Sequence, residues 1–350
     1  MKAMQDGTSN TGFPAKKARK SHAWVWVLAL VVGLPVVALV ALAVLVVCAV
    51  VLIEAPQRHP GMGADEFPVL RETWSYGGGD TKVVRIPLKG VLVERDDGGP
   101  FYSRGPVEIA LRQIRAATAD DEVKAIILEV DSPGGGLTAS DLIYKALVDF
   151  RAGSPDRRVV ALLGDIAASG GYYVTTAADY IVAHPTTITG SLGVIISKVN
   201  VKKLGDEYGV KLETIKSGRN KDILSPFADL SDEQRVVLQE VVDEMQGRFV
   251  GLVLKARPAV AKEVIPQLTD GRVYTSSKAL EYKLIDEIGY WDDAVARTGS
   301  LLGVDEVKVV RYNEEFSFSA LLAGAQEASF SAGGLLDKIA RARVMSLWQW

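Results

Sequence analysis

Two glycine-rich turns carry the residues whose types and spacing could do chemistry. The first, Ala168-Ser169-Gly170-Gly171-Tyr172-Tyr173, sets one serine between an apolar run at 159–163 and a run of small residues at 174–178. This pattern predicts a strand, a sharp turn and a helix. A serine at such a turn can project its hydroxyl into a cleft, while glycines let a substrate backbone come close. The alternative is a tight turn that happens to contain serine, because short motifs often match by chance.

The second turn, Asp131-Ser132-Pro133-Gly134-Gly135-Gly136, lies upstream of the first. It follows residues 123–130, an apolar run that predicts a buried strand, and precedes residues 138–150, whose apolar residues recur at helical spacing. Open α/β folds build their sites at the carboxyl ends of parallel strands, where glycine N–H groups can point at an anion. The turn matches neither GxxxxGK[ST] nor GxGxxG, so nucleotide binding has little support.

A serine nucleophile needs a base, and histidine is scarce in this chain. His22 lies just before the apolar N-terminal segment, His59 lies just beyond it, and His184 precedes a proline and is expected to cap a strand. None has an obvious companion for a Ser-His-Asp arrangement. Lysine is the remaining common base. Its reference pKa of about 10.4 must fall by about three units to act near neutral pH, and burial can lower it that far.

Four motifs in a compatible order make a family resemblance specific. They are DSPGGG at 131–136, ASGGYY at 168–173, TGSLGVI at 189–195 and SGRNKDILSPF at 217–227, and the segment DGRVYTSSKALEYKLIDEIG at 270–289 follows them. From about Val83 to Gly289 the chain resembles the signal peptide peptidase A (protease IV) family of serine-lysine membrane proteases, in its short, single-copy form. The resemblance implies an α/β fold of the crotonase and Clp-protease kind, with several subunits in a ring.

The resemblance also implies a catalytic pair. Ser169 matches the family's nucleophile, Lys221 its general base, and Ser191 a serine that hydrogen-bonds the lysine amine. Serine and lysine of one site come from different subunits or copies in this family, so a single-copy chain would have to oligomerise. Lys216 is the competing lysine, but it precedes the motif's glycine and is expected to face solvent. The alternatives are that Ser191 is a turn serine and Lys221 a surface charge.

Three glycines match the family's oxyanion-hole positions. They are Gly135, with Gly134 as its less certain neighbour, and Gly170 through its N–H. Asp131 stands where the family usually has asparagine. Because a carboxylate would be unhelpful beside an oxyanion hole, we expect Asp131 to point away or to be hydrogen-bonded. His184 also stands where asparagine is more usual, and we assign it no role.

The N-terminal segment predicts a membrane anchor. No charged residue occurs from Ala23 to Ile53, a run longer than the ~20 helical residues that span a bilayer. Four basic residues lie within 16–20, so by the positive-inside rule the N-terminus is expected to be cytoplasmic and the catalytic part extracytoplasmic. A cleaved signal peptide is the alternative, but the run is long for one and no small-x-small site follows promptly.

Composition argues against several other classes of site and partner. The only cysteine, Cys48, lies in the expected span, so no disulfide within the chain and no cysteine-based zinc site can form. The net charge of −3 offers no basic field for nucleic acid. We expect no cofactor and no metal.

The expected organisation has five parts. A cytoplasmic basic tail (1–22), a transmembrane helix (23–53) and a linker (54–81) precede a protease domain (82–304) and a C-terminal tail (305–350). Helices are expected at 106–118 and 233–256 from their apolar spacing, the second with a capping box formed by Ser231 and Gln234. Tryptophans and basic residues in the tail suit a membrane-surface helix, a subunit interface, or binding back into the protein's own cleft.

The sequence therefore predicts a membrane-anchored serine endopeptidase that degrades remnant signal peptides and other short or unfolded apolar peptides. Its expected partners are peptide substrates, membrane lipid and further copies of itself in a ring. Two alternatives stay open. A crotonase-type acyl-CoA enzyme could use the same glycines without Ser169 or Lys221, and a non-catalytic membrane scaffold could retain the fold with a degenerate site.

Overall fold

The computed structural model describes residues 39, 40, 42, 68, 70–94, 104–313 and 344–347. The chain divides into two compact units, Met1–Pro60 and Gly61–Trp350, and the fold below is that of the second. The expected tail 1–22 and span 23–53 lie outside the described residues, apart from three helical positions within residues 39–42. No helix in the described part of the chain is both long and apolar enough to cross a membrane.

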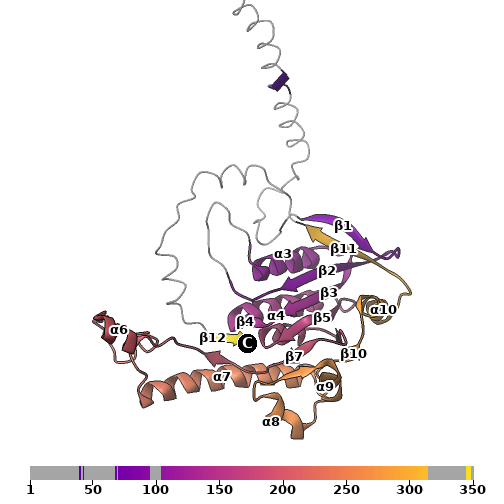
Figure 1. The fold of residues 1–350 in the computed structure, drawn as a ribbon. Helices are drawn as coiled ribbons and strands as arrows, with labels where there is room; N and C mark the ends of the chain where they lie inside the picture. Colours follow the sequence, from indigo (N-terminus) through magenta and orange to yellow (C-terminus); the bar gives the residue numbers. More distant parts are fainter. Residues whose placement is uncertain are drawn as a thin grey trace, which may run out of the picture. The chain divides into compact units, whose positions relative to one another are not determined.

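A mixed sheet runs through the middle of this unit (Figure 1). Its strands lie in the order β1-β11-β2-β3-β5-β6-β10, with β7 beside β5 and β9 beside β7. All neighbours are parallel except the antiparallel pairs β1–β11 and β7–β9. The strands are β1 (Arg71–Tyr76), β2 (Thr81–Lys89), β3 (Val123–Ser132), β5 (Arg158–Ala168), β6 (Tyr180–Ala183), β7 (Ile188–Gly190), β9 (Val273–Thr275), β10 (Glu287–Ile288) and β11 (Val307–Asn313).

Helices bury both faces of the sheet, which is why its central strands are almost continuously apolar. Alternate residues of β3 enter different cores: Ile126 and Leu128 pack in the larger core with α3, α4 and α5, whereas Ala125 and Ile127 pack in a smaller core with α10. The helices are α3 (Pro106–Ala119), α4 (Leu137–Ala152), α5 (Gly170–Thr175), α6 (Lys202–Tyr208), α7 (Asp232–Ala256), α8 (Ile265–Leu268), α9 (Ser276–Glu281) and α10 (Trp291–Leu302), with the 3-10 helix η2 (Lys262–Val264).

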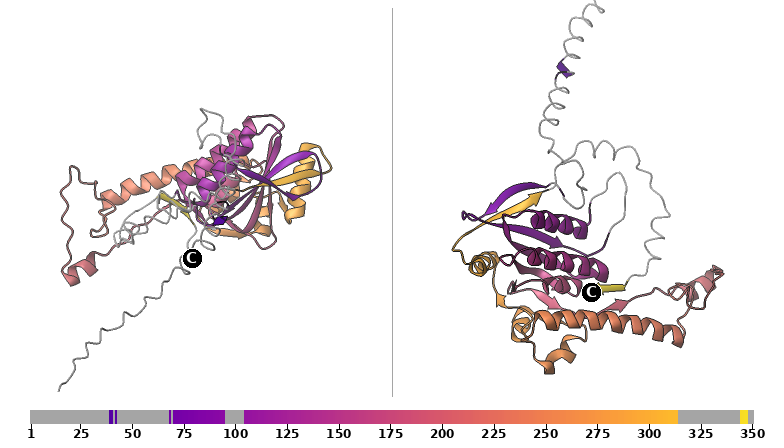
Figure 2. Two further views of the ribbon diagram at one scale, coloured as in Figure 1. Left: turned by 90° about the horizontal axis from the view of Figure 1, so that it is seen from above. Right: turned by 180° about the vertical axis from the view of Figure 1, so that it is seen from behind.

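A small second sheet lies beside the main one. It has the order β4-β12-β8 and consists of β4 (Gly134–Gly136), β8 (Ile195–Ile196) and β12 (Val344–Leu347). Helix α6 and the start of α7 form an arm that projects away from both sheets in Figure 1 and in both views of Figure 2. We define the arm as residues 198–233.

Most elements expected from periodicity are present. The strand expected at 123–130 and the helices expected at 138–150, 106–118 and 233–256 are found within two residues of their predicted ends. The capping box of α7 is confirmed, since the Ser231 hydroxyl accepts from Gln234 N–H while the Gln234 side chain accepts from Ser231 N–H.

The helix after the serine turn was placed wrongly. It was expected at 174–178 but is α5, Gly170–Thr175, which begins directly after Ser169. A Cβ at Gly171 would lie 2.5 Å from the carbonyl oxygen of Ser132, so only glycine lets the first helical turn approach the neighbouring strand this closely.

The sheet extends beyond both ends of the range 82–304. β1 lies in the segment expected as a linker, and β11 and β12 lie in the segment expected as a C-terminal tail. β11 pairs with both β1 and β2 and so separates two strands that are consecutive in sequence. A short strand that pairs only with the far end of the chain has no local sequence signal.

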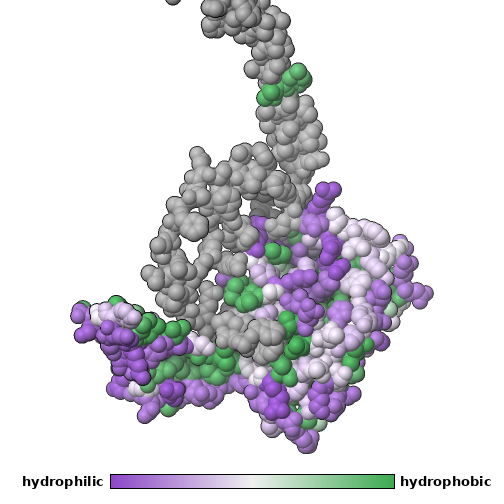
Figure 3. Space-filling model, viewed as in Figure 1, coloured by the Kyte–Doolittle hydropathy of each residue, from purple (hydrophilic) through white to green (hydrophobic). Residues whose placement is uncertain are grey.

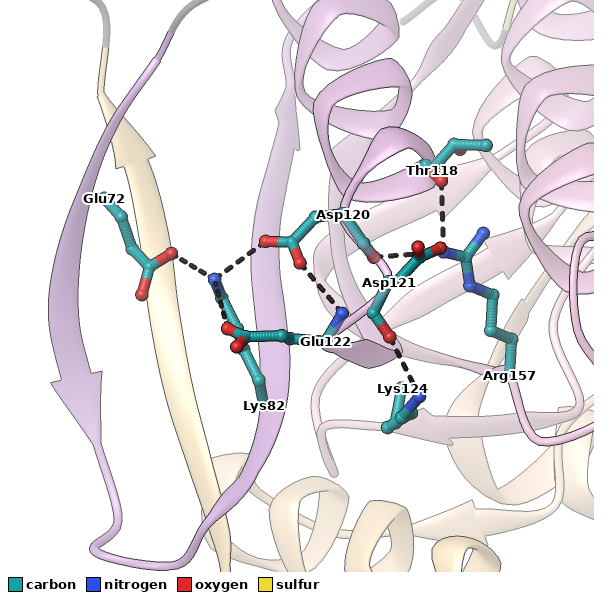
Figure 4. Close-up of polar contacts among 8 residues, drawn as sticks. All are labelled: Glu72, Lys82, Thr118, Asp120, Asp121, Glu122, Lys124 and Arg157. Carbon is teal, nitrogen blue, oxygen red and sulfur yellow. Dashed lines mark hydrogen bonds and ion pairs between the residues drawn. The ribbon is translucent and has the colours of Figure 1, made fainter.

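A cluster of ion pairs links β1 to β2 and to the turn before β3 (Figure 4). The Lys82 ammonium on β2 contacts Glu72 on β1, Asp120 at 2.8 Å and Glu122 at 3.8 Å. Burial alone would lower the pKa of Lys82, but the hydrogen bonds to Asp120 and Glu72 raise it overall. Burial would raise the pKa of Asp120, but Lys82 and the N–H of Glu122 lower it overall.

Candidate active site

Ser169 occupies a strained junction between β5 and α5. Its φ of 55° is unusual for a residue other than glycine, and its ψ is −119°. The surroundings hold this conformation, because Ser169 N–H donates to Gly190 at 2.7 Å and Ser169 C=O accepts from Tyr173 N–H at 2.8 Å. The serine is almost fully buried, at 1% exposure. The predicted strand-to-helix junction is thus confirmed.

The second glycine turn lies beside the first because β3 and β5 are neighbours. Ser132 pairs with Ala167, so the two turns leave adjacent parallel strands side by side. The Ser132 hydroxyl donates to Gly90 C=O at 2.7 Å and accepts from Gly134 N–H at 3.1 Å. Gly134 has a φ of 101°, which favours glycine there.

Leu92 determines which way the backbone of Gly135 faces. Leu92 N–H donates to Gly134 C=O at 2.8 Å, and Gly136 N–H donates to Leu92 C=O at 2.7 Å. Since successive residues of a strand direct their N–H and C=O groups to opposite edges, those of Gly135 face the edge away from Leu92. That edge is the one that pairs with β12.

Gly170 opens helix α5 directly after the serine. The N–H groups of a first helical turn have no acceptor within their own helix, and the helix dipole makes that end favourable for negative charge. The structure therefore brings Ser169, Gly134, Gly135 and Gly170 to the same edge of the parallel sheet.

Ser191 is brought to this edge as well. β7 runs parallel to β5 with Gly190 opposite Ala168, and Ser191 follows β7 with a φ of 52°. Ser191 N–H donates to Arg272 C=O at 2.8 Å, and Ser191 C=O accepts from Gly193 N–H at 2.8 Å. The Ser191 hydroxyl makes no hydrogen bond to any described residue.

Lys221 is not brought to this edge. It lies in the loop between α6 and α7 on the arm, and it is exposed. Its N–H closes a turn onto Gly218 C=O at 3.1 Å, and within the described part of the chain its ammonium has no acidic partner. Lys216, in contrast, contacts Asp222 at 2.6 Å and donates to Arg219 C=O at 3.1 Å.

A strand of the chain's own C-terminal segment runs through the site. β12 lies antiparallel to β4, with Ser346 opposite Gly135 and Leu347 opposite Gly134. On its other edge β12 lies antiparallel to β8, with Val344 opposite Ile196. We call the space between β4 and β8 the strand slot. Residues 344–347 thus pair with two strands of their own chain. Which of the three alternatives the tail as a whole takes stays a prediction.

Asp131 is hydrogen-bonded, as expected. One of its carboxylate oxygens accepts from Ile166 N–H at 3.3 Å. His184 lies after β6 with its ring 5.4 Å from that of Tyr290. Among the described residues no group of histidine, cysteine and carboxylate side chains could hold a metal ion. Leu92 could not be predicted from the sequence, because nothing local marks a leucine whose backbone holds a distant glycine turn.

The fold and these turns define a class: an α/β protein in which a central parallel strand of the sheet ends in a strained serine turn beside glycine N–H groups. Residues 152–305 match peptidase family S49. The chain is 33% identical over 284 residues to a putative signal peptide peptidase SppA of Enterococcus faecium, with 80% of each chain covered. It is 36% identical over 228 residues to a putative protease of Synechocystis, covering 65% of this chain and 77% of that protein.

A longer relative matches over part of its length. Protease 4 of Salmonella typhi is 37% identical over 204 residues, which cover 58% of this chain and 32% of the relative. The chain therefore belongs to the S49 peptidase family, the family of signal peptide peptidase A. The expected family membership is confirmed.

Proposed function

We propose that the protein is a membrane-anchored serine endopeptidase that cleaves signal peptides and other short or unfolded apolar peptides. The observation that carries this proposal is the strand slot. A stretch of extended polypeptide, residues 344–347, pairs there with β4 and β8 on both edges. Backbone pairing of this kind is how strand-addition sites hold peptides largely independently of sequence.

The direction of β12 places a bound peptide relative to Ser169. β12 is antiparallel to β4, so its chain runs toward Gly134 and thus toward the end of β3, beside which the serine turn lies. A substrate bound in the same direction would bring the carbonyl of its residue opposite Gly135 to the Gly135 N–H, and the peptide bond that follows this residue to Ser169. The slot therefore holds the residues on the amino side of the bond to be cut.

The chemistry follows from the residue types. The Lys221 amine, when neutral, accepts the Ser169 proton, and Oγ attacks the carbonyl carbon of the bound peptide. N–H groups of Gly135 and Gly170 stabilise the oxyanion. The lysine returns its proton to the leaving amine, and a water then releases the acyl group from Ser169. An acyl-CoA reaction would leave the strained serine without a role.

The position of Lys221 supports a site shared between subunits. The lysine is exposed on an arm directed away from its own Ser169, so a second copy of the chain would supply the missing partner (Figures 1 and 2). A neutral lysine requires desolvation, which packing against a neighbour would supply.

The surface of the arm favours such packing. Hydrophobic side chains gather along it in Figure 3, an arrangement that is uncommon on a monomeric surface. The exposed apolar residues of the arm and the adjoining turns of α7 are Val199, Leu204, Tyr208, Val210, Leu212, Ile215, Val236 and Val237. We propose a ring in which each arm covers the site of the next subunit.

The anchor and the substrate class extend the same proposal. The uncharged run 23–53 anchors the chain in the membrane with its N-terminus in the cytoplasm, and the catalytic unit lies on the other side of the membrane. The name of the relative from Enterococcus faecium supports signal peptides as substrates, which are apolar and short once released.

The test is hydrolysis of a quenched-fluorescent apolar peptide by the detergent-solubilised full chain and three variants. Ser169→Ala and Lys221→Ala should each abolish cleavage and leave the circular dichroism spectrum unchanged. Lys216→Ala is the matched control, because Lys216 is committed to Asp222 and should lose little activity. Cleavage by Ser169→Ala at the wild-type rate would reject a serine peptidase, and a dead Lys216→Ala beside an active Lys221→Ala would reverse the lysine assignment.

A further inference from the structure

The geometry points to Gln246, on α7, as a positioning residue that holds Ser191 in place for the lysine. This inference rests on the proposed function, because it concerns how the base of that same site is oriented. Gln246 belongs to none of the four motifs, and it acts through the backbone of the residue after Ser191.

The side-chain amide of Gln246 joins two loops. Its Nε2 donates to Leu192 C=O at 2.7 Å and to Thr269 C=O at 3.3 Å. Leu192 directly follows Ser191 and is 1% exposed. Water therefore cannot easily reach the Leu192 carbonyl to replace the hydrogen bond from Gln246. Both acceptors are carbonyls, so they require the NH₂ end of the amide on this side. The Oε1 atom is buried and has no partner among the described residues.

The two loops that Gln246 joins are the ones that clamp Ser191. Thr269 leads into Arg272, whose C=O accepts from Ser191 N–H at 2.8 Å, and β9 then pairs with β7 immediately before Ser191. Gln246 thus bonds to the segment on each side of the clamp. With both donors removed, the Leu192 carbonyl is left buried and unpaired, and the loops are no longer tied to α7.

The strained backbone of Ser191 depends on the hydrogen bonds from Gln246. A φ of 52° at a serine persists only while the surroundings hold it. α7 is well suited to hold it, because Phe249, one turn further along, is fully buried in the main core. If the turn relaxes, the Ser191 hydroxyl moves away from the position where it meets the lysine amine.

The consequence for catalysis is a change in the base. A hydroxyl that donates to the amine nitrogen favours the neutral lysine, which is the form that accepts the Ser169 proton. Loss of this hydrogen bond therefore disfavours the neutral amine. The acid limb of the rate profile then moves to higher pH, and kcat falls at neutral pH, while peptide binding in the strand slot is unchanged.

The experiment compares Gln246→Met with Gln239→Met in the full chain. Methionine keeps the length and helix propensity of glutamine but has no donor. Gln239 is the matched control, because it lies on the same helix and its Nε2 donates only to the exposed Asp243 at 2.7 Å. Gln246→Met should lower kcat about tenfold, a small part of the roughly 10²–10⁴-fold effect of a positioned base, with KM unchanged. Its acid limb should move to higher pH, and Gln239→Met should match the wild type in all three.

One further variant, with Ser169→Ala as the inactive reference, keeps the outcomes separate. Gln246→Glu, whose ionised carboxylate cannot donate, should behave like Gln246→Met above about pH 5. If both Gln246 variants are unfolded, or lose kcat without a shift of the acid limb, the residue is merely structural and the inference is overturned. It is also overturned if both match the wild type while Ser169→Ala is dead. If Ser169→Ala itself is active, the proposed function fails first.

Discussion

Replacement of Gly135 by alanine should misplace the proposed oxyanion donor and leave the rest of the site intact. A Cβ on Gly135 would lie 2.1 Å from the carbonyl oxygen of Leu92 and 2.6 Å from both its carbonyl carbon and its nitrogen. Gly135 does not have a positive φ, so the obstacle is steric and not a forbidden dihedral angle. Both partners are backbone, so no side chain can rotate out of the way.

The required movement sets the size of the effect. Opening the 2.1 Å contact to an acceptable Cβ distance moves β4 away from Leu92 by roughly 1 Å. The N–H of Gly135 faces the opposite edge, so it moves with the strand into the slot. A misplacement of about 1 Å costs on the order of 100-fold in rate, which matches the roughly 10²–10³-fold loss on removal of one oxyanion donor. Overpacking should also cost about 1–3 kcal/mol of stability.

The assay is steady-state hydrolysis of the quenched peptide together with thermal unfolding, and Gly136→Ala is the control. A Cβ on Gly136 would meet its nearest neighbours, Ala139 Cβ and Leu92 O, at 3.6 Å, an ordinary contact. Gly135→Ala should lose about 100-fold in kcat, and Gly136→Ala should keep most of its activity. Equal activity in the two variants, or a greater loss in Gly136→Ala, would refute the assignment of Gly135.

Three more outcomes are expected. Lys82→Met should lower the free energy of unfolding by about 1–3 kcal/mol at pH 7 in urea titrations, because Glu72 and Asp120 lose their shared hydrogen-bond donor. The pKa of Asp120 is lowered in the folded state, so its ionised carboxylate stabilises the fold above about pH 4, and this stabilisation is lost as the pH falls through the folded pKa. The Lys82→Met protein should therefore lose less stability than the wild type on acidification. A reporter fused after residue 60 should be active only outside the cytoplasm, with residues 1–53 retained; a mature N-terminus near residue 54 would show a cleaved signal instead. Deletion of residues 344–350 should lower KM for an added peptide at constant kcat, and an unchanged KM would argue against the strand slot as the substrate site.

The turns of the site could be predicted from the sequence because their glycines answer local requirements. Gly171 is needed where α5 meets Ser132, and Gly134 is needed for a positive φ. The buried strands around them are apolar runs of a length typical of parallel sheets. Each of these properties depends on a few consecutive residues. The motifs and the alternation of strand and helix are therefore sufficient to predict these turns and strands.

The remainder depends on contacts between distant segments. β11 lies between β1 and β2, Leu92 braces Gly135, and Gln246 reaches Leu192, yet no local pattern connects any of these pairs. The family resemblance placed Lys221 in a catalytic pair with Ser169. In the single chain this lysine lies exposed on the arm, and the proposal that a second copy completes the site rests on that position.

Mixing two inactive variants tests the shared serine-lysine site most directly. Ser169→Ala and Lys221→Ala proteins are each expected to be inactive, and they are combined in equal amounts under conditions that allow subunits to exchange. With random assembly into rings, about a quarter of the subunit contacts would pair an intact Ser169 with an intact Lys221. The account predicts that about a quarter of the wild-type activity per site returns. Mixed oligomers that form and yet cleave no peptide would contradict it.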